Sequence, residues 1–129
     1  MKDVLTGLDC YEVFLRKLQK EIDTVGDDKI AIIYTDIKHF KYINDTYGYK
    51  VGDSLLKEFV DEFMQGGDFI LCASRVYSDN FVVANRIVAG THSNEELREM
   101  IYQMNLEREA KFREKYLNSR LQFCTGISI

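Results

Sequence analysis

Hydrophobic positions recur along this chain with two different periods, and these periods divide it into helices and strands. Residues 10–24 and 52–65 carry apolar side chains three or four positions apart, which predicts two helices with one apolar face each. Residues 29–37, KIAIIYTDI, are almost continuously apolar and β-branched, as expected for a central strand buried on both faces. The strand-like runs 69–76 and 81–89 are separated by only four residues, which predicts a β-hairpin.

The second half of the chain predicts one long helix and a last strand. Ser93 and Glu96 have the spacing of a capping box, so we expect a helix to begin there and to continue to about Asn118. Residues 121–129, LQFCTGISI, then read as a strand. The side chains expected on the inner face of the long helix are Leu97, Ile101, Met104, Arg108, Phe112 and Tyr116.

From residue 29 onward the predicted order is βαββαβ, the ferredoxin-like arrangement. The expected fold is therefore α+β, an antiparallel sheet with helices packed on one face. With no proline, linker or repeat, residues 1–129 read as a single domain. Because the chain stops on an apolar run, we expect the domain to be truncated, with its C-terminal part beyond Ile129.

Composition and charge narrow the classes of function. A net charge of −4 argues against nucleic acid as a partner, which would favour a basic face. No run approaches the roughly 18 apolar residues of a membrane span, so no membrane contact is expected. The three cysteines show no CxxC spacing, which fits a reducing compartment. We therefore expect a cytoplasmic domain, alone or as the cytoplasmic part of a larger sensor protein.

Two aspartates are candidates for a shared metal site. Asp36 ends the predicted central strand and Asp79 lies in the hairpin turn. The first strand of a βαββαβ sheet lies beside the hairpin, so the two carboxylates are expected to converge. Paired carboxylates of this kind bind Mg²⁺, which prefers oxygen ligands and bridges to phosphates. Asp is also common in turns, so a structural role for both residues stays open.

A second candidate group lies between the first predicted strand and the second helix. Asn44 and Asp53 flank a Tyr-Gly turn, and an amide with a carboxylate can read the edge of a purine. The alternative is helix capping, because Asp53 lies in the first turn of a helix, where the dipole favours negative charge. Lys41 is either a phosphate-binding or a solvated lysine.

Three segments together have the order and spacing of a GGDEF domain: DVLTGLDCYEVF, DIKHFKYINDTYGYKVGDSLL and RVYSDNF. The chain resembles this family of diguanylate cyclases over nearly its whole length. The resemblance implies a palm-like fold, as in nucleotidyl cyclases, and a role in bacterial cyclic di-GMP signalling. An active member binds GTP with Mg²⁺, and two domains meeting face to face convert two GTP into cyclic di-GMP.

The resemblance assigns roles by position. It implies three groups of site residues: the metal ligands Asp36, Ile37 (through its carbonyl) and Asp79, the guanine-reading pair Asn44 and Asp53, and Phe40 with Lys41 around the phosphates. Asp79, the acidic third residue of the family signature, is also the implied catalytic residue, and the family glutamate that should follow it is replaced by Asn80.

The hairpin signature departs from the family pattern. Tyr77 and Ser78 stand in place of two glycines, Asn80 in place of a glutamate, and Lys38 in place of the second aspartate of DID. Glycine lets the backbone approach a ligand closely, so Tyr77 is expected to crowd the nucleotide or to change the turn. Losing the carboxylate at position 80 costs on the order of a few kcal/mol of transition-state stabilisation if that group acts in the reaction.

A further departure concerns feedback inhibition. The RxxD motif would place its arginine at Asp68 and its aspartate at Leu71, so no binding of cyclic di-GMP at such a site is expected.

The sequence therefore favours a catalytically inactive GGDEF domain that serves as a GTP-binding, regulatory or dimerisation module, with Mg²⁺ when nucleotide is bound. The expected contacts are GTP, a second copy of the chain or partner signalling domains. An active diguanylate cyclase and an interaction scaffold without nucleotide remain the alternatives.

Overall fold

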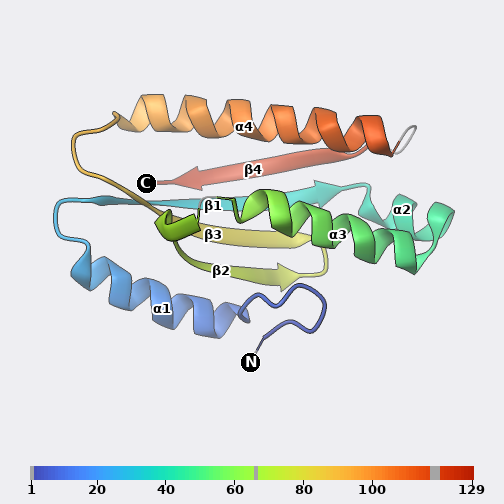
Figure 1. The fold of residues 1–129 in the computed structure, drawn as a ribbon, viewed down its shortest axis with the longest axis horizontal. Helices are drawn as coiled ribbons and strands as arrows, with labels where there is room; N and C mark the ends of the chain where they lie inside the picture. Colours follow the sequence, from blue (N-terminus) through green and yellow to red (C-terminus); the bar gives the residue numbers. More distant parts are fainter. Residues whose placement is uncertain (1, 66, 117–119) are drawn as a thin grey trace.

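In the computed structural model, helices and strands alternate along the chain (Figure 1). The structure describes residues 2–65, 67–116 and 120–129, without the side chain of residue 68. In chain order the elements are α1 (Tyr11–Thr24), β1 (Lys29–Lys38), α2 (Phe40–Tyr47), α3 (Tyr49–Phe63), the 3₁₀ helix η1 (Gly67–Phe69), β2 (Ile70–Tyr77), β3 (Asn80–Ile87), α4 (Asn94–Lys115) and β4 (Gln122–Ser128).

The four strands form one antiparallel sheet in the order β2-β3-β1-β4. This is the ferredoxin-like order, so the predicted α+β fold is confirmed. Strand β1 lies in the interior of the sheet, between β3 and β4, which explains its nearly continuous apolar sequence. As predicted, it runs directly beside the second strand of the hairpin.

Helices cover both faces of the sheet. On one face, Phe81 and Val83 of β3 pack with residues of α3 and α4. On the other face, the alternate residues Val82 and Ala84 pack with Phe14 of α1. The prediction of helices on one face therefore holds for α3 and α4, whereas α1 lies on the opposite face, beside β2 in Figure 1.

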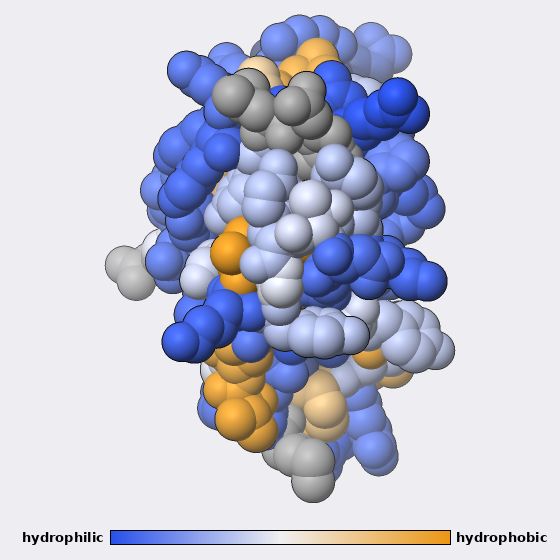
Figure 2. Space-filling model, turned by 90° about the vertical axis from the view of Figure 1, so that its right-hand side faces the viewer, coloured by the Kyte–Doolittle hydropathy of each residue, from blue (hydrophilic) through white to orange (hydrophobic). Residues whose placement is uncertain are grey.

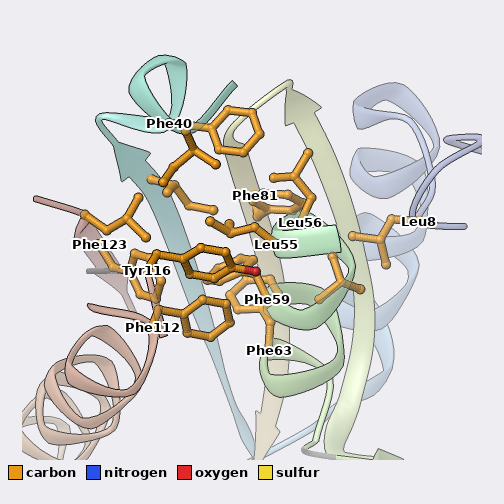
Figure 3. Packing of buried hydrophobic residues seen from close by; sticks show 14 of the residues in the cluster. Leu8, Phe40, Leu55, Leu56, Phe59, Phe63, Phe81, Phe112, Tyr116 and Phe123 are labelled. Carbon is orange, nitrogen blue, oxygen red and sulfur yellow. The ribbon is translucent and has the colours of Figure 1, made fainter. Parts of the chain in front are cut away.

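Phe59 of α3 lies at the centre of the larger core (Figure 3). Its ring centroid is 4.9 Å from that of Phe81, 5.1 Å from Phe63 and 5.3 Å from Phe123. Aromatic pairs at these distances add to the stabilisation from buried apolar area. Because these rings come from α3, β3 and β4, this cluster holds α3 against the middle and one edge of the sheet.

The region between β1 and α3 is more helical than the sequence predicts. We expected a loop and a turn before a helix beginning at residue 52, but α2 occupies Phe40–Tyr47 and α3 begins at Tyr49. Helix α2 buries only Phe40 and Ile43, and one such pair is too short a pattern to reveal a helix. Gly48, with a φ of 87°, lets the chain pass from α2 directly into α3.

The remaining boundaries differ from the prediction by a few residues. The capping box is confirmed: the Ser93 hydroxyl accepts from the Glu96 N–H at 3.1 Å, and the Glu96 carboxylate accepts from the Ser93 N–H at 3.4 Å. The four-residue hairpin turn is in fact a two-residue turn, because Tyr77 pairs with Asn80. The helix predicted to end at residue 65 ends at Phe63, and the long helix ends at Lys115, while residues 117 and 118 of its predicted continuation lie outside the described residues.

Candidate functional site

The end of β1 and the hairpin turn meet at one end of the sheet. Asp36 pairs with Asn80 in the β1–β3 register, and the Ile37 N–H donates to the Asp79 carbonyl at 3.0 Å. The structure thus brings together the three residues predicted to bind a metal and the residue that replaces the family glutamate. Figure 2 looks onto this end of the molecule, where hydrophilic residues cover most of the surface.

Both candidate metal-binding carboxylates already have a side-chain nitrogen as partner. The Lys38 ammonium lies 2.5 Å from one carboxylate oxygen of Asp36. Its hydrogen bond to Asp36 raises the pKa of Lys38 above the ordinary value, and the charge of Asp79 contributes in the same direction. The Asn80 amide donates to the Asp79 carboxylate at 3.1 Å. These two contacts give the site a built-in cation and a neutral donor.

This donor set does not fit a Mg²⁺ site well. Mg²⁺ needs a near-octahedral shell of oxygen ligands and loses affinity when an ammonium binds one of its carboxylates. Within the described ranges, no group of three or more His, Cys, Asp or Glu side chains is placed to hold a metal ion. The oxygen donors at this end of the sheet are the Ile37 carbonyl and the two aspartates, and the Lys38 ammonium is paired with one of these aspartates.

The hairpin turn has its own brace, which the sequence did not reveal. Arg75 donates through Nε to the Ser78 carbonyl at 3.0 Å and through Nη1 to Asp3 at 3.2 Å. Asp3 also accepts from the Thr6 N–H at 2.8 Å and from its hydroxyl at 2.6 Å. Burial raises the pKa of Asp3, but the hydrogen bonds from Thr6 and Arg75 hold it below the ordinary value. The N-terminal loop thus fixes the position of the turn.

The backbone of the hairpin turn adopts dihedral angles that non-glycine residues tolerate. Within the described residues, positive φ among non-glycine residues occurs only at His39 and Arg120, so Ser78 and Asp79 both keep negative φ. The usual two-residue hairpin turns need positive φ, which is where glycines would serve. Tyr77 is 73% exposed and forms part of the wall of a cavity of about 430 Å³ beside Asp36.

That cavity lies on the face of the sheet that α1 covers. Its wall includes Asp36, Asn80, Tyr77, Tyr34 and Tyr11. A hydrogen bond with Tyr11, together with burial, raises the pKa of Tyr34 above its ordinary value. Tyr77 borders this space and is mostly exposed, so its ring does not fill the cavity beside Asp36.

The candidate guanine-reading residues lie where α2 meets α3. A Cβ added to Gly52 would lie 1.9 Å from the Asn44 side-chain oxygen, so the amide rests directly on the first turn of α3. Asp53 is the next residue and is exposed. Asn44 and Asp53 are nine positions apart in the sequence, and the junction of α2 with α3 places both at one corner of the fold.

The two predicted phosphate-contacting residues differ in their surroundings. Lys41 is exposed on the first turn of α2. Phe40 is buried, and its side chain packs in the main core (Figure 3). Any contact between Phe40 and a ligand would therefore involve its backbone N–H at the helix N-terminus, where unpaired donors favour anions. The sequence identified Lys38 only as the replacement of a family aspartate, whereas in the structure its ammonium contacts Asp36.

Comparison with known proteins identifies the family. The diguanylate cyclase GGDEF domain pattern matches residues 1–129. The uncharacterized protein y4lL of Sinorhizobium fredii is 32% identical over 130 residues, covering 98% of this chain and 15% of that protein. Diguanylate cyclase DgcS of Shewanella oneidensis is 34% identical over 85 residues, covering 64% of this chain and 29% of that protein. The chain thus spans less than a third of the length of these relatives.

Solved structures of GGDEF domains have the same fold. A sensory box/GGDEF family protein from Caulobacter crescentus superposes with a TM-score of 0.74 at 24% identity, over 98% of this chain and 81% of that one. The GGDEF domain of DgcB from Caulobacter crescentus, in complex with c-di-GMP, gives a TM-score of 0.74 at 19% identity, over 98% and 75% of the two chains. None of the described helices is long and apolar enough to cross a membrane. With the family pattern matched along its whole length and the same fold as these domains, the chain belongs to the GGDEF domain family of diguanylate cyclases.

Proposed function

We propose that this chain is a GGDEF domain of cyclic di-GMP signalling that binds GTP but does not join two GTP molecules. It would then act as a regulatory or dimerisation module. The observation that carries this proposal is the ion pair between Lys38 and Asp36, at 2.5 Å. The Lys38 ammonium, on a half-exposed side chain, pairs with the carboxylate that would otherwise hold the metal.

Charge explains why metal-dependent chemistry is disfavoured. Positions 36, 38, 79 and 80 together carry a net charge of −1 here, whereas the DID and GGDEF patterns of the family carry −4 at these positions. A divalent cation is attracted less strongly by a net charge of −1 than by −4, and an ammonium within a few ångströms repels it. When bound in an active family member, Mg²⁺ would neutralise the phosphates. In this chain Lys38 would be the cation that faces them.

The features that support GTP binding lie away from this ion pair. Asn44 and Asp53 share the α2–α3 corner, where the amide and the carboxylate can hydrogen-bond to a guanine edge. The first turn of α2 provides backbone N–H groups for phosphate, and Lys41 adds an exposed cation. Together with Lys38, these groups can position a nucleotide without a metal ion.

Calorimetry tests this proposal directly. GTP is titrated into the protein with 5 mM Mg²⁺ and again with EDTA, taking ATP as the control for guanine reading, all at about the same ionic strength. We expect GTP to bind in both buffers with similar affinity, and ATP to bind more weakly. In Lys38→Asp, which restores the family residue, GTP binding becomes dependent on Mg²⁺. An absence of heat with GTP in both buffers supports the scaffold alternative and overturns the nucleotide-binding part.

A further inference from the structure

A groove on the other face of the sheet is large enough for a small molecule. It lies between α3, α4 and the strands and has a volume of about 860 Å³. Its lining includes the apolar side chains of Ile33, Phe63 and Leu97, and also charged residues such as Glu62 and Glu107. Ligand sites are commonly concave, largely apolar and about 300–1,000 Å³ in volume. Because β-strand side chains alternate between faces, this groove is separated by the sheet from the cavity beside Asp36.

Buried polar groups without partners gather in this groove. Within the described residues, five buried side-chain atoms lack a hydrogen-bond partner, and four of them belong to residues that line the groove: Thr35 Oγ1, Asn105 Oδ1, Arg108 Nε and Thr125 Oγ1. Thr35 is 2% exposed and Asn105 is 5% exposed. A buried polar group normally has a partner, because an unmade hydrogen bond is costly. Four of the residues that line the groove therefore carry a polar atom without a partner in the protein.

Arg108 gives the groove its charge preference. Its guanidinium lies 5.9 Å from the ring centroids of both Phe59 and Phe63, and Nη2 is 3.5 Å from the Glu62 carbonyl oxygen. The carboxylate of Glu62 is ion-paired with Lys111. Within the described residues no carboxylate lies within ion-pair distance of Arg108; burial lowers its pKa, and the nearby charge of Glu62 acts in the opposite direction. A half-buried cation of this kind is complementary to a planar anion, above all a carboxylate.

Asn105 defines a second polar requirement. Its Nδ2 donates to the Phe123 carbonyl at 2.8 Å, which fixes the orientation of the amide and leaves Oδ1 as an acceptor in the groove. Asn105 and Arg108 are three residues apart on α4, so their side chains lie on one face of the helix about 5–6 Å apart. A ligand that satisfies both needs a hydroxyl donor a few atoms from its carboxylate.

We infer that the groove between α3, α4 and the sheet binds a small apolar hydroxy acid, with its carboxylate on Arg108, its hydroxyl on Asn105 and its hydrocarbon body along the apolar wall. The two threonine hydroxyls, Thr35 and Thr125, provide further hydrogen bonds at the floor. This site is additional to the proposed nucleotide site and does not depend on it.

The test uses 3-hydroxydecanoate as the probe, below its micelle concentration, titrated into the ¹⁵N-labelled chain. We expect saturable binding that shifts backbone resonances of α4 and β4. Arg108→Met keeps the length and the contact with the phenyl rings but removes the charge, and should weaken binding at least tenfold. The matched control Arg98→Met, on an exposed position of the same helix, should bind like the unaltered chain. Decane-1,3-diol, which lacks the carboxylate, should bind at least tenfold more weakly than the acid.

Three outcomes would overturn the inference. They are no saturable binding by the unaltered chain, equal binding by folded Arg108→Met, and equal binding of the acid and the diol. In the first case the groove is filled by water that satisfies its polar atoms. Circular dichroism establishes that each variant is folded, and Thr125→Val, which removes one floor hydroxyl with little change in volume, should weaken binding on its own. GTP calorimetry on the same samples keeps this result separate from that of the nucleotide site.

Discussion

Replacing Gly52 by alanine should separate folding from nucleotide binding. The added Cβ would lie 1.9 Å from the Asn44 oxygen, whereas ordinary contacts begin at 3.4 Å, so the amide must move by about 1.5 Å. The backbone at Gly52 is helical, and alanine in a helix interior is favoured over glycine by about 1 kcal/mol. The atom that clashes is the end of a side chain, so a rotation of Asn44 relieves most of the strain.

These opposing effects predict a free energy of unfolding within about 1 kcal/mol of the unaltered protein. Affinity for GTP should respond differently, because the Asn44 amide, which we propose reads guanine, is displaced by more than the tolerance of a hydrogen bond. The loss of one such bond corresponds to about a tenfold weaker Kd. Urea unfolding and calorimetry with GTP measure the two quantities, with Ser54→Ala, an exposed position two residues further along α3, as the control.

The reasoning is refuted if Gly52→Ala binds GTP as tightly as Ser54→Ala does, while the NMR signal of the Asn44 side-chain amide shows that this amide has moved. Guanine would then be read by other groups. A variant that unfolds at much lower urea concentration would instead show that the α2–α3 junction tolerates no rotation of Asn44.

Three further predictions concern stability and thiol chemistry. Because the folded-state pKa of Asp3 lies below its ordinary value of 3.8, Asp3 adds stability above about pH 4 that is lost as the pH falls through the folded pKa, and Asp3→Asn should remove that part of the acid dependence in a urea series. Burial raises the pKa of the Cys72 thiol to about 11, so maleimide at pH 8 should label the exposed Cys124 rapidly and Cys72 only after unfolding. Phe59→Ala should lower the free energy of unfolding by about 3–5 kcal/mol, whereas Phe69→Ala, at an exposed position, should change it by about 0.5 kcal/mol or less.

Local patterns predicted the parts of the fold whose sequence signal is continuous. The apolar run of β1, the paired runs of the hairpin and the capping box at Ser93 each carry such a signal. Helix α2 does not, because one buried pair, Phe40 and Ile43, looks the same in a loop. In α4 the pattern placed Arg108 inward correctly but also Met104, which is 55% exposed. Asn105 takes the inward position because its amide reaches the Phe123 carbonyl.

The candidate site was predictable in its positions but not in its contacts. The backbones of Asp36 and Asp79 lie at the same end of the sheet, as the βαββαβ order leads one to expect. The ion pair of Lys38 with Asp36 was within reach of the sequence, since residues two apart on a strand face the same side. The contact of Arg75 with Asp3 was not, because 72 positions separate the residues and only the folded chain brings them together.

The most direct test of the central claim is a search for cyclic di-GMP as a reaction product. The protein is incubated with GTP and Mg²⁺ at concentrations high enough for two domains to meet, and the nucleotides are separated by chromatography. We expect GTP to remain unchanged, because the Lys38 ammonium is ion-paired with Asp36 and Asn80 stands in place of the family glutamate. Formation of cyclic di-GMP by this chain, abolished in Asp79→Ala, would contradict that account and identify an active cyclase.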